Sequence, residues 1–192
     1  MLPADEVRRR YEEIKAAAPG VTIVAATKYV SLEDMAVLAD AGIEVVGENR
    51  AQDLVAKHDR FADVFRWHFI GHLQSNKVKF VNRTCELVHS LASVSAAQRL
   101  EIPALIEVNL SGEPTKSGVA PEEIETLLGP NVRGLMTMPP LDGDSRRHFR
   151  ELRELAGRYG LPELSMGTTQ DWRVAVEEGA TLIRVGSVLF GK

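Results

Sequence analysis

Short runs of apolar residues recur along the chain, separated by longer stretches in which apolar and charged positions follow a helical period. We interpret each run as one strand, because its length and its apolar character are typical of strands. There are eight such runs: Val21–Ala26, Ile43–Val46, Trp67–Ile70, Leu87–Leu91, Ala104–Leu110, Val132–Met136, Leu161–Met166 and Thr181–Val185. Strands that alternate with helices in this number predict an α/β fold, a single closed (β/α)8 TIM barrel over residues 1–192.

Helix signals lie between the runs. Three segments have the spacing of a capping box at a helix start: Ser31–Asp34, Ser95–Gln98 and Thr168–Asp171. Gly42 and Gly179 follow helical stretches, where a left-handed residue is favoured. The segment Ser145–Tyr159 places its apolar residues on one face, and Asp5–Ala17 predicts an extra helix ahead of the first strand.

An open doubly wound sheet is the alternative fold. Such sheets usually have fewer strands, and no G-x-G-x-x-G motif follows the first apolar run. The weakest support for the barrel lies between the fourth and fifth strands, where residues 92–103 leave room for only a very short helix.

Composition narrows the classes of function. The 192 residues are 44% hydrophobic and 26% charged, with a net charge of −4 and no basic stripe interleaved with aromatics, so we expect no nucleic-acid partner. No apolar run approaches the roughly 20 residues of a membrane span, and the first residues lack a signal-peptide core. Cys85 is the one cysteine and is expected to be buried, which fits a cytoplasmic protein.

Polar residues follow most of the predicted strands, at the end of a barrel where chemistry gathers. Lys28 comes two residues after the predicted first strand, so its amine is expected to face the barrel mouth. Partial desolvation there would favour the neutral amine that forms a Schiff base. The alternative is a surface lysine without a function.

The ends of the last two strands suggest a phosphate site. Gly167 and Thr169 belong to a turn that leads directly into a helix, whose free N–H groups favour an anion. Gly186 and Ser187 add a close backbone approach and a second hydroxyl beside it. Barrels often bind phosphate at this place, although the same residues also serve as ordinary caps and turns.

Other polar residues fall within or near the strands. Arg184 lies inside the last strand, so it either pairs with a buried carboxylate or points at a ligand. Glu107, Asn109 and His72 are candidates for the same inward-facing network, whereas His68 is interpreted as a core histidine with its hydrogen bonds satisfied. No group of side chains has the spacing of a metal site.

The ordered set of motifs resembles one family. Its members share Ala26–Lys28, Gly47–Arg50, His68–Lys77, Val108–Asn109, Ser117–Gly118, Arg133–Met136, Leu164–Gly167 and Arg184–Ser187 in this order. The chain thus resembles the YggS/PROSC family of pyridoxal phosphate homeostasis proteins from about residue 21 to residue 191. Each motif alone is unspecific, but the ordered set is highly specific.

The resemblance implies a barrel like the N-terminal domain of alanine racemase, usually monomeric, that binds pyridoxal 5′-phosphate. It implies an internal aldimine on Lys28, Asn49 beside the cofactor ring, and Arg184 facing the pyridine nitrogen. The phosphate cradle that it implies consists of Ser165, Gly167, Thr169, Gly186 and Ser187.

The resemblance also limits the expected chemistry. A cation beside the ring nitrogen disfavours its protonation, so the cofactor would be a poor electron sink. A racemase needs acid/base groups on both faces of its substrate, and alanine racemase takes one from a second domain, which we expect to be absent after Lys192. We therefore expect a non-catalytic carrier or buffer of the cofactor, with pyridoxal-phosphate-dependent apoenzymes as candidate partners.

Two enzymatic alternatives stay open. The first is a small amino-acid racemase, with Lys28 on one face and His72 or Tyr29 on the other. The second is a sugar-phosphate aldolase that uses Lys28 without the cofactor.

Three departures from the family pattern change the expectations. Thr168 and Thr169 replace the usual Met-Ser, which keeps a hydroxyl at the second position. The region 93–103 is shortened, which puts the fourth helix in doubt. The C-terminal tail is also short, so we expect the helix Asp5–Ala17 to cover the barrel flank there.

Overall fold

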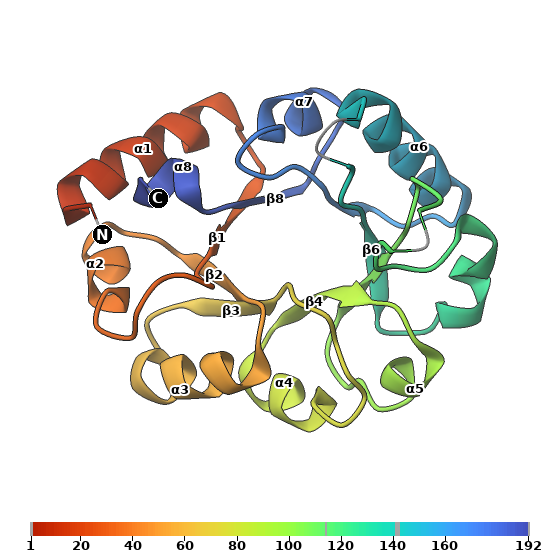
Figure 1. Ribbon diagram of the computed structural model, residues 1–192, viewed down its shortest axis with the longest axis horizontal. Coiled ribbons are helices and arrows are strands. Elements are labelled where there is room, and N and C mark those ends of the chain that lie inside the picture. The colour runs from red at the N-terminus through yellow and green to blue at the C-terminus, as the bar shows by residue number, and fades with distance from the viewer. Residues whose placement is uncertain (1, 114, 141–142, 192) are drawn as a thin grey trace.

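The computed structural model of the chain, which describes residues 2–113, 115–140 and 143–191, is a closed barrel. Its eight strands follow one another in chain order, each parallel to the next, and β8 pairs with β1 to close the ring (Figure 1). Helices surround the ring on the outside. The predicted (β/α)8 barrel is confirmed, and the open sheet is excluded.

All eight predicted strands form. Their bounds are β1 (Thr22–Ala26), β2 (Val45–Glu48), β3 (Arg66–Phe69), β4 (Leu87–Leu91), β5 (Ala104–Glu107), β6 (Val132–Met136), β7 (Glu163–Ser165) and β8 (Leu182–Val185). The fifth run was predicted to continue to Leu110, but β5 ends at Glu107. The chain leaves the sheet there, and Val108 makes only an isolated bridge with Val119.

The connections are helical, with one exception. The α-helices are α1 (Ala4–Ala17), α2 (Met35–Asp40), α3 (Ala51–Phe61), α4 (Val78–Thr84), α5 (Val94–Ala97), α6 (Ser145–Arg158), α7 (Trp172–Glu177) and α8 (Ser187–Phe190). A 3-10 helix, η1 (Pro121–Leu127), replaces an α-helix between β5 and β6. None of the helices in the described part of the chain combines the length and the apolar character that crossing a membrane requires.

The capping contacts at Ser31 and Thr168 form, but α2 and α7 begin at Met35 and Trp172, three residues later than those caps predict. Gly42 and Gly179 have φ values of 79° and 94°, which confirms the left-handed positions. The α5 helix has only four residues, as the short connection predicts, but the cap at Ser95 is wrong. Ser93 has extended backbone and accepts a hydrogen bond from the Ala96 N–H at 3.3 Å, so the helix starts two residues earlier than predicted.

The first and last helices lie side by side on one flank of the barrel (Figure 1). The Arg10 guanidinium donates to the Val188 carbonyl at 3.1 Å, and Leu2 packs close to Gly191. This arrangement confirms that the N-terminal helix covers the flank next to the short C-terminal segment.

The core has two parts. The larger part lies between the strands and the surrounding helices, and a small apolar cluster fills the inside of the barrel. That inner cluster consists of Val24, Val45, Leu87, Leu105, Met136 and Leu182. Strand residues alternate between the two faces of the barrel wall. His89 and Arg184 lie two positions from the inward-facing Leu87 and Leu182, and His68 and Ser165 pair with the same two leucines. All four polar side chains therefore also point into the barrel.

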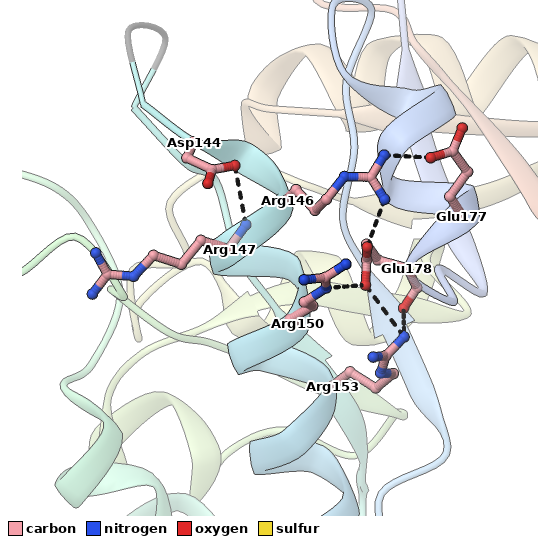
Figure 2. A network of polar contacts seen from close by, with 7 residues as sticks. All are labelled: Asp144, Arg146, Arg147, Arg150, Arg153, Glu177 and Glu178. Atoms are coloured by element: carbon pink, nitrogen blue, oxygen red, sulfur yellow. Dashed lines mark hydrogen bonds and ion pairs between the residues drawn. The ribbon is translucent and has the colours of Figure 1, made fainter.

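On the outside, α6 is bound to the end of α7 by ion pairs (Figure 2). The Glu178 side chain is buried and contacts Arg146, Arg150 and Arg153, which follow one another along α6. This cluster fixes the position of α7, whose other end begins at the turn that follows β7.

Candidate functional site

A cavity of about 650 Å³ opens at the C-terminal ends of the strands, the end where TIM barrels carry their active sites. The residues that line it are Ala26, Lys28, Tyr29, Val30, Asn49, Ile70, Met138, Thr168, Thr169, Gln170, Arg184, Gly186, Ser187 and Phe190. Six of the eight predicted site residues are among them. Residues that are 159 positions apart in the chain, Lys28 and Ser187, therefore share one cavity.

The two other predicted residues, Ser165 and Gly167, are not in the cavity lining. Ser165 is fully buried on β7, and its hydroxyl contacts Arg184 and His89. Gly167 has a φ of 92°, and a Cβ there would lie 2.5 Å from the Ala175 Cβ. The glycine therefore lets the turn pack tightly on α7. Both residues support the site from behind, and direct phosphate contact by either stays a prediction.

Lys28 lies at the cavity mouth with an exposed side chain. The side chain is exposed to solvent, and its Nζ lies 4.7 Å from the centre of the Tyr29 ring. The expectation of a partly desolvated amine is therefore wrong for this structure. The expected direction is right, since the amine reaches the cavity.

A buried ion pair lies directly behind Lys28. The Glu48 carboxylate at the end of β2 is fully buried and accepts from the Lys57 ammonium of α3 at 2.5 Å. Lys57 also donates to the Thr27 carbonyl at 2.8 Å, and the Thr27 hydroxyl donates to Glu48 at 2.6 Å. The backbone immediately before Lys28 is thus fixed by two charged side chains, which are expected to limit its movement.

Asn49 is held from the same carboxylate. Its backbone N–H donates to Glu48 Oε2 at 3.2 Å, and its carbonyl lies so close to Gly71 that a Cβ there would come within 1.9 Å. The side-chain Oδ1 of Asn49 is buried and has no hydrogen-bond partner among the described residues. A buried, unpaired amide oxygen in a cavity wall indicates an acceptor for a ligand's donor.

The sequence left two alternatives for Arg184, an ion pair with a buried carboxylate or an orientation toward a ligand, and the structure favours the second. Its guanidinium donates to the Thr137 carbonyl at 3.1 Å and to the Ser165 hydroxyl, and it lines the cavity. Within the described chain it forms no ion pair with a carboxylate. Burial lowers the pKa of Arg184 to about 10, with the charge of Glu107 acting in the opposite direction, so the group remains a cation at neutral pH.

The other candidates for an inward-facing network lie in different environments. Glu107 is buried, and its carboxylate accepts from the Ser117 hydroxyl at 2.5 Å. Asn109 bonds within its own loop, to the Glu113 carbonyl, and the His72 side chain is exposed. The prediction of an inward position is therefore wrong for Asn109 and His72, whose strand ends leave the barrel wall.

The two turns predicted to bind phosphate are in contact with each other. The Gly186 N–H donates to the Thr169 hydroxyl at 3.2 Å, which joins the end of β8 to the turn after β7. The neighbouring Thr168 N–H donates to the Asp171 carboxylate at 2.7 Å, which confirms the capping contact before α7. Thr169 and Ser187, which both carry hydroxyls, line one cavity as a result.

Several polar groups at the site were not singled out from the sequence. Lys57 lies on a helix and meets β1 only in the fold, so no local pattern indicates its role. His89 is hidden in the continuous apolar run of β4. His68 is buried and hydrogen-bonded to His89, which confirms its interpretation as a core histidine. The described residues contain no cluster of His, Cys, Asp and Glu suited to a metal ion.

Comparison with known proteins places this geometry in a family. The family model of the alanine racemase N-terminal domain matches residues 3–192. The chain belongs to this family. Within it, the pyridoxal phosphate homeostasis protein of Aquifex aeolicus is 41% identical over 88% of this chain and 86% of its own length. The protein of the same description from Pseudomonas aeruginosa is 40% identical over 79% of this chain and 75% of its own.

Solved structures show the same barrel. PipY of Synechococcus elongatus, described with PLP bound, superposes with a TM-score of 0.86 at 31% identity, covering 96% of this chain and 100% of its own. Alanine racemase of Corynebacterium glutamicum superposes with a TM-score of 0.77 at 14% identity, over 98% of this chain and 61% of its own. The latter likeness concerns the fold alone.

Proposed function

We propose that this protein binds pyridoxal 5′-phosphate in the mouth cavity, holds it as a Schiff base on Lys28, and acts in pyridoxal phosphate homeostasis as a carrier or buffer. The names of its relatives and the cofactor described in PipY support the choice of ligand. The cavity volume of about 650 Å³ lies in the usual range for small-molecule sites.

The observation that carries the proposal is the opening of Lys28 and Arg184 into one cavity. The pair supplies an amine for the aldehyde and a cationic donor for the ring nitrogen at different places in the wall. Asn49 adds a buried acceptor that lacks a protein partner, and Thr169 and Ser187 add hydroxyls for the phosphate. The residues present therefore fit the cofactor.

The bond to Lys28 requires a neutral amine. After the ammonium loses a proton to solvent, Nζ attacks the aldehyde carbon, a C=N bond forms, and the carbonyl oxygen leaves as water. The exposed position of Lys28 gives water access to this bond, so the reverse reaction releases the cofactor. The cofactor, when bound, supplies an electron-accepting ring, and Arg184 as a donor keeps the ring nitrogen unprotonated.

The wall of the cavity supports holding over catalysis. A racemase needs a second acid/base group opposite Lys28, and His72 is not in the lining. Tyr29 is in the lining, but its ring lies directly beside the Lys28 ammonium. The proposal therefore assigns no substrate reaction. It includes a monomer in the cytoplasm and pyridoxal-phosphate-dependent apoenzymes as the recipients.

Visible absorption on titration with pyridoxal 5′-phosphate tests the proposal. Wild-type protein is expected to develop the band of a protein-bound Schiff base. Lys28→Arg keeps the cation but cannot form the C=N bond, so it is expected to show no band. Lys79→Ala, at an exposed lysine of α4, serves as a matched control and should behave as wild type. An equal band in Lys28→Arg contradicts the assignment.

A further inference from the structure

A chain of hydrogen bonds crosses the inside of the barrel behind Arg184. The Arg184 guanidinium contacts the Ser165 hydroxyl, and Ser165 Oγ lies 2.7 Å from His89 Nδ1. His89 Nε2 in turn lies 2.9 Å from His68 Nδ1. His68 lines a second cavity of about 440 Å³ at the opposite end of the barrel, where the strands begin. Four side chains on four strands thus connect the two ends.

The direction of this chain follows from its first member. A guanidinium only donates, so Ser165 Oγ accepts from Arg184. Ser165 is fully buried, and within the described structure its hydroxyl contacts only Arg184 and His89. The hydroxyl proton is therefore directed to His89 Nδ1, which must be an acceptor.

The same reasoning fixes both histidines. Burial lowers the pKa of His89 well below its ordinary value and that of His68 to about 3, so both rings are neutral at pH 7. A neutral His89 that accepts at Nδ1 carries its proton on Nε2 and donates it to His68 Nδ1. His68 then carries its own proton on Nε2. All donors along the chain point away from Arg184.

We propose that His89, acting through Ser165, is a positioning residue that holds Arg184 as a donor toward the mouth cavity, with His68 fixing the tautomer of His89. This inference rests on the proposed function. If His89 protonated Nδ1 instead, Ser165 would face two donors and its own proton would lack an acceptor. The one-way chain thus keeps one guanidinium edge on Ser165 and leaves the remaining N–H groups to a ligand acceptor such as a pyridine nitrogen.

The first test needs no cofactor. Nitrogen-15 NMR of the imidazole rings distinguishes the two neutral tautomers, and His68→Gln and His89→Asn assign the signals. We expect both histidines to carry the proton on Nε2 at pH 7. A proton on Nδ1 of either ring, or a charged ring, contradicts the proposed direction of the hydrogen bonds.

The second test separates positioning from mere structure. Pyridoxal 5′-phosphate and its 1-deaza analogue, which lacks the ring nitrogen acceptor, are bound to wild type, His89→Leu and His89→Asn. His89→Leu removes the acceptor for Ser165, and His89→Asn keeps one near the position of Nδ1. We expect His89→Leu to weaken pyridoxal phosphate binding about tenfold and leave the analogue unchanged, and His89→Asn to resemble wild type.

Ser165→Ala breaks the chain at another member and is expected to lose the same preference, which keeps the test valid if His89→Leu does not fold. Equal weakening of both compounds, or an unchanged preference in the folded variants, overturns the role of His89 alone. Wild-type protein that binds neither compound overturns the proposed function and, with it, this role.

Discussion

Two carboxylates are buried at the outer side of the barrel wall, and their surroundings differ. Glu48 is fully buried beneath α3 and pairs with one lysine, Lys57. Glu178 at the end of α7 has a side chain that is 4% exposed and shares three arginines of α6 (Figure 2). Both link a helix to a neighbouring element, but the first depends on a single cation and the second does not.

The difference teaches which buried charge serves the site. Glu48 and Lys57 bind the Thr27 carbonyl and the Asn49 N–H, so they hold the backbone next to two cavity residues. Within the described part of the chain, the hydrogen bonds and ion pairs of Glu178 and its arginines join α6 to the end of α7 alone. Although both carboxylates are buried, we expect substitutions at the two sites to differ in their effects on stability and on cofactor binding.

Removing the Lys57 ammonium is expected to cause the largest loss of stability. Lys57→Met keeps the volume of the side chain but leaves Glu48 buried without its cation, which costs about 3–5 kcal/mol of unfolding free energy. Urea unfolding at neutral pH measures the change. A loss as small as that of an exposed charge substitution contradicts the dependence of Glu48 on Lys57.

Acid extends the comparison to the barrel interior, where His68 and His89 are buried and neutral at pH 7. The folded-state pKa of His68 is lowered to about 3 and that of His89 well below its ordinary value, by burial. Below about pH 6.5 the unfolded chain takes up protons that the folded chain does not, so the unfolding free energy falls as pH falls toward 3, by about 1.4 kcal/mol per pH unit for each histidine.

Unfolding free energies of wild type and His89→Asn between pH 7 and pH 5 measure this slope. The variant is expected to lose the share of one histidine. An identical slope in the two proteins would show that His89 is not a buried neutral group.

Cofactor affinity separates the two carboxylates directly. Glu48→Gln keeps the shape but removes the charge that binds Lys57 and the Asn49 N–H, so pyridoxal phosphate binding is expected to weaken about tenfold. Glu178→Gln is the matched control and is expected to leave the affinity unchanged. Equal losses in both variants would remove the distinction between the two sites.

The smallest effect is expected on the outer surface. Arg150→Ala leaves Glu178 with Arg146 at 2.7 Å and Arg153 at 3.4 Å, so the carboxylate stays paired. The melting temperature of Arg150→Ala is expected to fall several-fold less than that of Lys57→Met, because an exposed arginine that is one of three partners contributes little to stability. A drop as large as that of Lys57→Met contradicts the interpretation of a shared cluster.

The barrel could be predicted from the sequence because its strands produce local signals. Runs such as Leu87–Leu91 and Val132–Met136 coincide with β4 and β6. Lys28 lies two residues after β1, and Gly186 follows β8 directly. These features depend on neighbours in the chain. The family resemblance then pointed to Asn49 and Arg184, which the fold brings to one cavity.

The supporting groups could not be predicted, because their partners are distant in the chain. Lys57 meets Thr27 across 30 positions, and His89 meets Ser165 across 76. The position of Lys28 after a buried strand also gave a wrong expectation, because its side chain is exposed. The start of α5 was misplaced because Ser93 competes with Ser95 for the same cap.

The attachment of the cofactor to Lys28 is the central claim, and mass spectrometry tests it most directly. Protein mixed with pyridoxal 5′-phosphate is reduced with borohydride, which converts the C=N bond to a stable amine, and is then digested. The account predicts one phosphopyridoxyl group per chain, on the peptide that contains Lys28. An adduct on another lysine, or no adduct above that of Lys28→Arg, would contradict it.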